Sequence, residues 1–351
     1  MKYLFTLTIC AMALLWTSCQ GTARVKDDYT TKIDSLIKTT EPRSFNGVIL
    51  IRQKGETKYA RAQGFADVNQ KTALKVADQF STMSIAKQFT AALILQQVEK
   101  GSIDLQVPIR KYLPGFKYAW ADSITLHQLL NHTSGLQSDD MDKPLKFKPG
   151  SAFSYSNVGY AVAGLVLEQQ SGQSFEALVS ALFKQCQMVH SCYPSVPNSK
   201  HLSKGHTIQK DGTVVQHETV RFDASHCFGS HLVVTVPDLA TWNDYLHGGK
   251  LLKPATYKLM CSYEKTNAHP LFGDQAIGYG YGLRINDRDS IPELGHTGFH
   301  PGEGFTAVNL YYPGTQTSII VLENIASENF EIAYYFEQEI RKIVKAGSLL
   351  R

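Results

Sequence analysis

The first feature of the chain is the position of its β-like segments, which lie near both ends. Two β-rich runs follow residue 45 and are joined through Lys54, Gly55 and Glu56, so they predict a hairpin. Further alternating or wholly apolar runs, bounded by Gly and Pro, occupy the C-terminal third. The predicted strands lie within NGVILIRQKGE (46–56), TKYARAQGFADV (57–68), YGYGLRIN (279–286), GFTAVNLYYPG (304–314) and QTSIIVLEN (316–324).

Helical patterns dominate the interval between these strands, from about residue 104 to residue 255. Three segments there combine helical spacing of apolar residues with a final glycine, which commonly caps a helix. The amphipathic run at 330–344 predicts a C-terminal helix, and residues 31–38 predict a short one near the start. The three glycine-terminated segments are SITLHQLLNHTSG (123–135), NVGYAVAGLVLEQQSG (157–172) and PDLATWNDYLHGG (237–249).

Strands at both ends around a helical middle predict an α+β fold. The simplest assembly is one antiparallel sheet built from both termini and flanked by helices, with residues 104–255 inserted as a helical subdomain. We expect the folded domain to span residues 45–346, after a tether and short helix over residues 19–44. A length of 351 residues suits one large unit of this kind.

The first 18 residues are typical of an export signal. Lys2 precedes an apolar run from Tyr3 to Trp16, which is shorter than the roughly 20 residues that a spanning helix needs. The following LWTSC resembles a bacterial lipoprotein signal, in which Cys19 becomes the lipidated first residue, although Trp16 stands where a smaller residue is usual. Ordinary cleavage without lipidation is the alternative.

A lipid on Cys19 would place the protein in the bacterial cell envelope, held at a membrane by this anchor only. Gln20 lacks the acidic character associated with retention at the inner membrane, so we expect the outer membrane. Whether the domain faces the periplasm or the cell surface stays open.

The composition of the chain limits the kinds of partner and cofactor that we expect it to bind. The chain carries 35 basic and 31 acidic residues, with no dense basic run, so we expect no nucleic-acid partner. Its histidines show no H-x-H or H-E-x-x-H spacing, and therefore neither a metal ion nor a cofactor is expected. The oligomeric state is not indicated. Four cysteines of the exported chain allow three full pairings or remain thiols: Cys186, Cys192, Cys227 and Cys261.

The candidate chemistry begins with Ser84 and Lys87, which stand three residues apart at the front of an apolar helix pattern. The S-x-x-K pattern also occurs at Ser35 and Ser262, but neither leads into a long amphipathic helix. Three residues make nearly one helical turn, so the Lys87 amine can reach the Ser84 hydroxyl. The unpaired N–H groups of a helix start can also stabilise an oxyanion.

A serine hydroxyl attacks a carbonyl only when a base removes its proton, so further groups are needed. The chain has one Y-x-N match, from Tyr155 to Asn157, directly before the predicted helix at 157–172. It also has one K/H-T-G match, from His296 to Gly298, where a strand is expected to begin.

These three motifs, in this order, resemble those of the serine β-lactamase and penicillin-binding-protein superfamily, in its class C-like branch. The stretches LHQLLNHTSGL, PGSAFSYSNVGY, VPDLATWNDYL and GYGYGLRI are also similar to that family. The resemblance covers roughly residues 45 to 345. It implies a serine hydrolase that works through an acyl-enzyme, without metal or cofactor, on a small-molecule or peptide substrate.

The resemblance also implies roles. Ser84 would be the nucleophile, Lys87 would tune its protonation, and Tyr155 would act as general base and then protonate the leaving group. A phenol is a weak base near neutral pH unless cations favour its anion, and which of Lys87 and Tyr155 takes the first proton stays open. His132, within NHTSG, is expected to form a turn beside the site.

The remaining implied residues bind the substrate. Asn157 would bond a substrate amide, while His296, Thr297 and Gly298 would line a strand edge. The backbone N–H groups of Ser84 and Phe299 would form the oxyanion hole.

His296 bears on the substrate, because many family members have a lysine there that favours a substrate carboxylate. Histidine is only partly charged near neutral pH. D-amino-acid peptides or small esters are therefore the expected substrates. A β-lactamase, and a penicillin-receptor-like sensor without turnover, stay open as alternatives.

Overall fold

The computed structural model describes residues 28–194, 201–218 and 227–351. The predicted export signal and Cys19 lie outside these described residues. In the described part of the chain, no helix combines the length and apolar character needed to cross a bilayer.

An eight-stranded sheet joins the two ends of the chain in the order β2-β1-β14-β13-β12-β11-β10-β9, and its neighbouring strands are antiparallel. The prediction of one antiparallel sheet built from both termini is confirmed. The predicted hairpin turns at Lys54 and Gly55, whose φ angles of 50° and 81° are typical of tight turns. The strands are β1 (Gly47–Gln53), β2 (Glu56–Gln63), β9 (Thr266–Asn267), β10 (Ile277–Tyr279), β11 (Arg284–Asn286), β12 (Glu293–His300), β13 (Phe305–Tyr312) and β14 (Thr317–Glu323).

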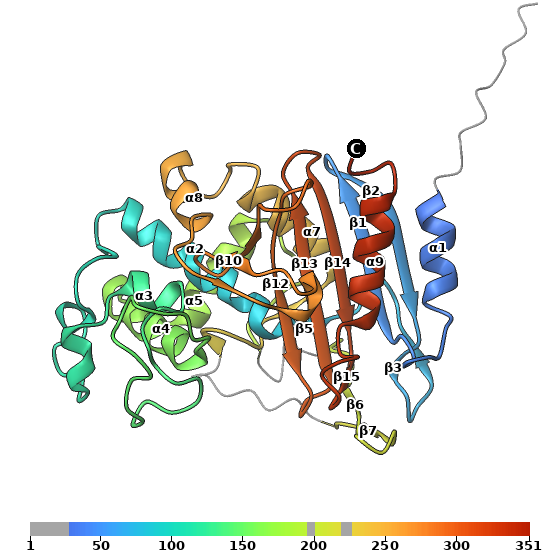
Figure 1. Ribbon diagram of the computed structural model, residues 1–351, viewed down its shortest axis with the longest axis horizontal. Coiled ribbons are helices and arrows are strands. Elements are labelled where there is room, and N and C mark those ends of the chain that lie inside the picture. The colour runs from blue at the N-terminus through green and yellow to red at the C-terminus, as the bar shows by residue number, and fades with distance from the viewer. Residues whose placement is uncertain (1–27, 195–200, 219–226) are drawn as a thin grey trace, which may run out of the picture.

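The two faces of this sheet bury separate apolar clusters, because successive side chains of a strand point to opposite sides. Val48 and Leu50 of β1 join one cluster, and Ile49 and Ile51 join the other. Figure 1 shows two helices side by side on the outer face, where the second cluster lies. Those outer helices are α1 (Asp28–Leu36) and α9 (Tyr335–Ala346), whereas α2 (Ala86–Glu99) and α7 (Val236–Leu246) belong to the first cluster.

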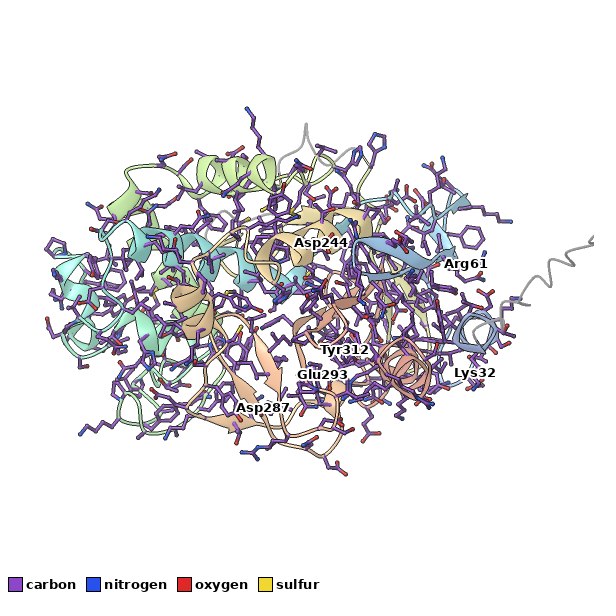
Figure 2. The ribbon with its side chains drawn as sticks, turned by 90° about the horizontal axis from the view of Figure 1, so that it is seen from above. Lys32, Arg61, Asp244, Asp287, Glu293 and Tyr312 are labelled. Carbon is purple, nitrogen blue, oxygen red and sulfur yellow. The ribbon has the colours of Figure 1, made fainter. Side chains whose placement is uncertain are left out.

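A buried carboxylate fixes α9 to the sheet. Glu293 of β12 accepts hydrogen bonds from the Tyr312 hydroxyl at 2.9 Å and from Nε of Arg341 on α9 at 2.8 Å. Figure 2, in which α9 is seen end-on, shows Glu293 and Tyr312 next to each other beside this helix. Charge-assisted bonds of this kind replace the water that the buried carboxylate has lost.

Three helices of the predicted helical interval, α3, α4 and α5, form a second lobe to the left of the sheet in Figure 1, whereas α7 of the same interval packs against β1 and β14 of the sheet. Helix α4 ends at the predicted Gly172, which adopts φ 66°, whereas α3 stops at Asn131 because His132, at φ 60°, turns the chain before Gly135. The interval is not helical throughout, since it also contributes β6 (His206–Ile208), β7 (Val214–Gln216) and β8 (Val233–Val234). Besides α7, the helices of this interval are α3 (Leu126–Leu130), α4 (Asn157–Ser171) and α5 (Phe175–Gln185), and α8 (Pro254–Met260) begins at its end.

Short strands and single turns complete the described chain. The hairpin of β6 and β7 pairs with β15, and β8 pairs with β5. Cys186 and Cys261 carry free thiols. The short elements are β3 (Phe65–Asp67), β4 (Thr72–Ala73), β5 (Phe80–Ser81), β6 (His206–Ile208), β7 (Val214–Gln216), β8 (Val233–Val234), β15 (Ile325–Ser327) and the 3-10 turns η1 (Met83–Ile85), η2 (Ile109–Lys111), η3 (Ala119–Asp122) and η4 (Pro270–Phe272).

Gly282, between β10 and β11, should be far less tolerant of a methyl group than a glycine at a helix end. It adopts φ 65°, and a Cβ there would lie 2.6 Å from the carbonyl oxygen of Lys87. We expect Gly282→Ala to lower the free energy of unfolding by about 2–4 kcal/mol, from the left-handed backbone and the clash together. Urea denaturation measures the loss.

Gly172→Ala is the matched control, because Gly172 has nearly the same φ but nothing within 4 Å of the added Cβ. Its loss should be only about 1 kcal/mol. Equal losses in the two variants would show that Lys87 and Gly282 are not in tight contact.

Candidate active site

Ser84 lies in a single turn of 3-10 helix, and α2 begins two residues later, at Ala86. Met83, directly before the serine, adopts φ 46°, a region that bulky residues rarely occupy and that often marks a functional site. Nearly every residue of α2 is buried, so this helix runs through the core and carries Lys87 with it.

The Lys87 amine is the centre of the site. Its Nζ lies 3.1 Å from Ser84 Oγ, 2.9 Å from Asn157 Oδ1 and 2.8 Å from the carbonyl oxygen of Gly229. The side chain is fully buried, and loss of water lowers the pKa of the amine. The neighbouring Tyr155 raises that pKa, whereas the Arg284 charge lowers it further. A neutral amine that donates to Asn157 and Gly229 presents its lone pair to the Ser84 hydroxyl.

Tyr155 approaches this amine from the extended segment before α4. The Lys87 Nζ lies 5.0 Å from the centre of the Tyr155 ring, and the guanidinium carbon of Arg284 lies 5.8 Å from it. The ring is half-buried. Tyr155 therefore lies next to both the amine and the guanidinium of the site.

His132 holds the segment that carries Tyr155. Its carbonyl oxygen accepts from the N–H of Ser154 at 2.9 Å, and its Nδ1 accepts from the N–H of Ser156 at 3.2 Å. Burial, with the charges of Lys87 and Arg284, lowers the pKa of His132 well below its usual value. This neutral imidazole forms the turn that the sequence predicted beside the site.

The third motif lies in β12, but His296 does not face the pocket as a charged group. Its side chain is fully buried, with Nε2 2.7 Å from the Tyr279 hydroxyl and Nδ1 2.6 Å from the carbonyl oxygen of Thr297. Burial lowers its pKa well below the usual value, and the charges of Arg284 and Lys87 lower it further. The expectation that His296 is partly charged near neutral pH is therefore wrong.

The other residues of this motif have separate surroundings. Thr297 is buried, and its Oγ1 accepts from Arg284 Nε at 3.2 Å. A Cβ on Gly298 would lie 2.6 Å from the carbonyl oxygen of Thr82, so the glycine permits β12 to pack against η1. This contact brings the strand edge next to Ser84.

A pocket of about 380 Å³ opens at this contact. Ser84 and Phe299, whose N–H groups were predicted to form the oxyanion hole, both line it, and so does Asn157. The Asn157 amide oxygen already accepts from Lys87, so it orients the amine in addition to facing a substrate. The described residues of the lining are Met83, Ser84, Ser138, Asp139, Met141, Asn157, Val158, Ala161, Gly229, Ser230, His231, Phe299 and His300.

Arg284 is a residue of this site that the motifs did not reveal. It is 6% exposed, its Nη1 has no hydrogen-bond partner, and no carboxylate pairs with it among the described residues. A buried, unpaired cation is costly, so its charge points to a task at the site. The sequence held one signal, a lone arginine between Leu283 and Ile285 in a predicted strand. For Gly229 we find no comparable signal.

The family model described as Beta-lactamase matches residues 34–341. Protein flp of Staphylococcus aureus (strain N315) is 26% identical over 335 residues, which cover 87% of this chain and 65% of flp, so the chain spans less than two thirds of that relative. A penicillin-binding protein of Bacillus subtilis (strain 168) is 25% identical over 323 residues, or 81% of this chain and 69% of the relative.

Among solved structures, the D-amino acid amidase from Ochrobactrum anthropi SV3 matches with a TM-score of 0.78 at 22% identity. The match covers 91% of this chain and 99% of the amidase. It supports the predicted β-lactamase/transpeptidase fold of sheet, flanking helices and helical lobe. Because the family model spans most of the chain, this protein belongs to the β-lactamase family of serine hydrolases.

Proposed function

We propose that this protein is a cell-envelope hydrolase that forms an acyl-enzyme at Ser84 and cleaves amide or ester bonds of D-amino-acid derivatives or small esters. The observation that carries the proposal is the buried Lys87 amine, 3.1 Å from the Ser84 hydroxyl. Burial disfavours its charged form, so the lysine is suited to accept a proton.

Acylation follows from this geometry. Ser84 Oγ bonds to the substrate carbonyl carbon as its proton passes to Lys87 Nζ, and the carbonyl oxygen gains the negative charge. The N–H groups of Ser84 and Phe299 stabilise this oxyanion. The intermediate then collapses, and the leaving nitrogen or oxygen takes a proton from the Tyr155 hydroxyl. The Lys87 ammonium reprotonates Tyr155, and water releases the acyl group by the same steps.

The pocket favours substrates with an apolar portion and a few polar groups. Apolar atoms reach it from Met83, Met141, Val158 and Phe299, and Ser138, Asp139 and Asn157 add polar ones. His296 is neutral and buried, so it supplies no charge for a substrate carboxylate. This supports amides and esters over penicillins, and the D-amino acid amidase that shares the fold agrees with such a choice.

The envelope location rests on the N-terminal sequence, which lies outside the described residues. The N-terminal apolar run is followed by Cys19 within LWTSC, so we propose that Cys19 carries the lipid and that the protein is anchored in the outer membrane. The tether between Cys19 and α1, which begins at Asp28, would separate the hydrolase domain from the bilayer.

Ser84 should be the acylated residue. A fluorophosphonate probe, mapped by mass spectrometry, should modify Ser84, and Ser84→Ala should lose more than about 10³-fold in kcat/KM toward D-amino-acid amides or p-nitrophenyl esters. Tyr155→Phe should lose about 10²-fold, as for removal of a general acid or base. Nitrocefin is included in the same panel.

Ser35→Ala and Ser262→Ala are the controls, because both serines belong to S-x-x-K patterns but are exposed. Both should retain full activity. Modification at either serine would overturn the assignment. Efficient nitrocefin turnover would favour a β-lactamase, and labelling without turnover would favour a sensor.

Arg284 should set the pH at which the enzyme becomes active. Lys87 acts as a base only when neutral, so kcat/KM should rise with pH through the pKa of its amine. The Arg284 charge lowers that pKa. Arg284→Gln should therefore raise it and move the ascending limb of the pH profile of kcat/KM to higher pH.

Arg284→Lys retains the positive charge and should restore the limb toward its wild-type position. A limb that stays in place in Arg284→Gln, with only the maximal rate reduced, would assign Arg284 a purely structural role. The pH profile thus separates the charge of Arg284 from its packing.

Cys19→Ala should release the protein from the membrane fraction. The lipid is the only proposed anchor, so the variant should appear as a soluble or unprocessed chain in cell fractionation, while the wild type carries an acyl mass on its N-terminal peptide. A soluble wild type without acyl mass would contradict the anchor.

A further inference from the structure

Two histidines and a glutamate converge at the rim of the pocket that holds Ser84. His231 comes from the loop before β8, His300 ends β12, and Glu303 lies in the turn between β12 and β13. One ligand atom from each lies within 4.8 Å of the others. His231 and His300 also line the pocket. His231 is remote in sequence from the other two residues, and a turn separates His300 from Glu303. No spacing motif in the sequence therefore predicted the cluster.

The turn that carries His300 and Glu303 is held firmly. The carbonyl oxygen of His300 accepts from the N–H of Glu303 at 3.1 Å and from that of Gly304 at 2.9 Å. The Thr207 hydroxyl of β6 donates to the carbonyl oxygen of Pro301 in the same turn. A constellation on such a supported turn has little freedom to lose when it binds a ligand.

His231 is also oriented by its neighbours. It is 6% exposed and adopts φ 69°, a strained conformation for a residue other than glycine. Its Nδ1 meets the Ser230 hydroxyl, which leaves Nε2 directed at the Glu303 carboxylate, 2.9 Å away. In metal sites, a hydrogen bond on one ring nitrogen commonly fixes the other as the ligand.

Glu303 brings its carboxylate to the two imidazoles. One of its oxygens lies 2.9 Å from His231 Nε2, and one ligand atom of each of the three residues lies within 4.8 Å of the others. The site thus offers one anionic oxygen and two imidazole nitrogens. Ca²⁺ and Mg²⁺ prefer oxygen-rich sets, whereas Zn²⁺ favours this combination.

We propose that His231, His300 and Glu303 form a zinc-binding site on the rim of the active-site pocket. The ion would replace the proton shared by His231 Nε2 and Glu303, and that proton would leave to solvent. His300 is exposed, so rotation of its side chain can bring its ring nitrogen to bonding distance.

Three protein ligands leave a fourth position of zinc open, as in zinc sites that bind water or substrate. Since two of the ligands line the pocket, this position is available to an oxygen of a pocket ligand, such as a carboxylate. Zinc would then supply the positive charge that the neutral His296 does not. This effect on substrate choice rests on the proposed hydrolase function, whereas metal binding itself does not.

The test is titration of the purified chain, prepared without a histidine tag, with Zn²⁺ by calorimetry and with Co²⁺ by visible absorption. We expect one ion per chain, visible bands of tetrahedral Co²⁺, and tighter binding as pH rises because the histidines must be deprotonated. His300→Ala and Glu303→Gln should each weaken binding by at least about tenfold. They replace the two more accessible ligands and should preserve the fold, which a thermal melt verifies.

His190→Ala, which removes an exposed histidine outside the cluster, should bind zinc like the wild type. Ser84→Ala should also bind normally, so failure of the proposed hydrolysis and failure of the zinc site are distinguishable. Absence of binding in the wild type, or equal affinity in wild type, His300→Ala and Glu303→Gln, would overturn the proposal.

Discussion

The burial of the Lys87 amine is the constraint on which the rest of the site depends. An amine without water is tolerated only when acceptors replace that water or when it gives up its charge. Its three hydrogen-bond partners come from separate places: the turn before α2, the start of α4, and the loop at Gly229. The amine is therefore positioned beside the nucleophile only when α2, α4 and the loop at Gly229 have come together.

Close backbone contact between the lobes makes this meeting possible. Gly298 permits β12 to approach the carbonyl of Thr82, and Gly282 approaches the backbone of Lys87 itself. Neither place has room for a side chain. The sheet edge, the strained turn at Met83 and the catalytic helix thus form one rigid unit around a pocket of about 380 Å³. Such rigidity holds hydrogen-bond donors where charge develops during the reaction.

Within the active site, one side chain is charged and the groups around it are neutral. Arg284 is permanently cationic, and its field lowers the pKa of Lys87, His132 and His296 in addition to the effect of burial. The groups that would otherwise compete for protons are thereby neutral, and the lysine is available as a base. At the rim, Glu303 lies against His231, which lines the same pocket together with His300.

Short stretches of the sequence were sufficient to predict much of the fold and part of the active site. The periodicity of apolar residues predicted the C-terminal helix and a sheet built from both ends of the chain. It could do so because alternation in strands and helical spacing in helices are properties of short segments. Ser84 and Lys87 were paired by the spacing of a single helical turn, and the motifs at Tyr155 and His296 followed from their order in the chain. Tertiary structure alone decided the rest. Three features depend on burial and on contacts between segments that are remote in the sequence: the neutrality of His296, the position of Arg284 beside Tyr155, and the contact of His231 with Glu303. The physical reason is that desolvation and Coulomb energies are set by those contacts and not by neighbouring residues in the sequence.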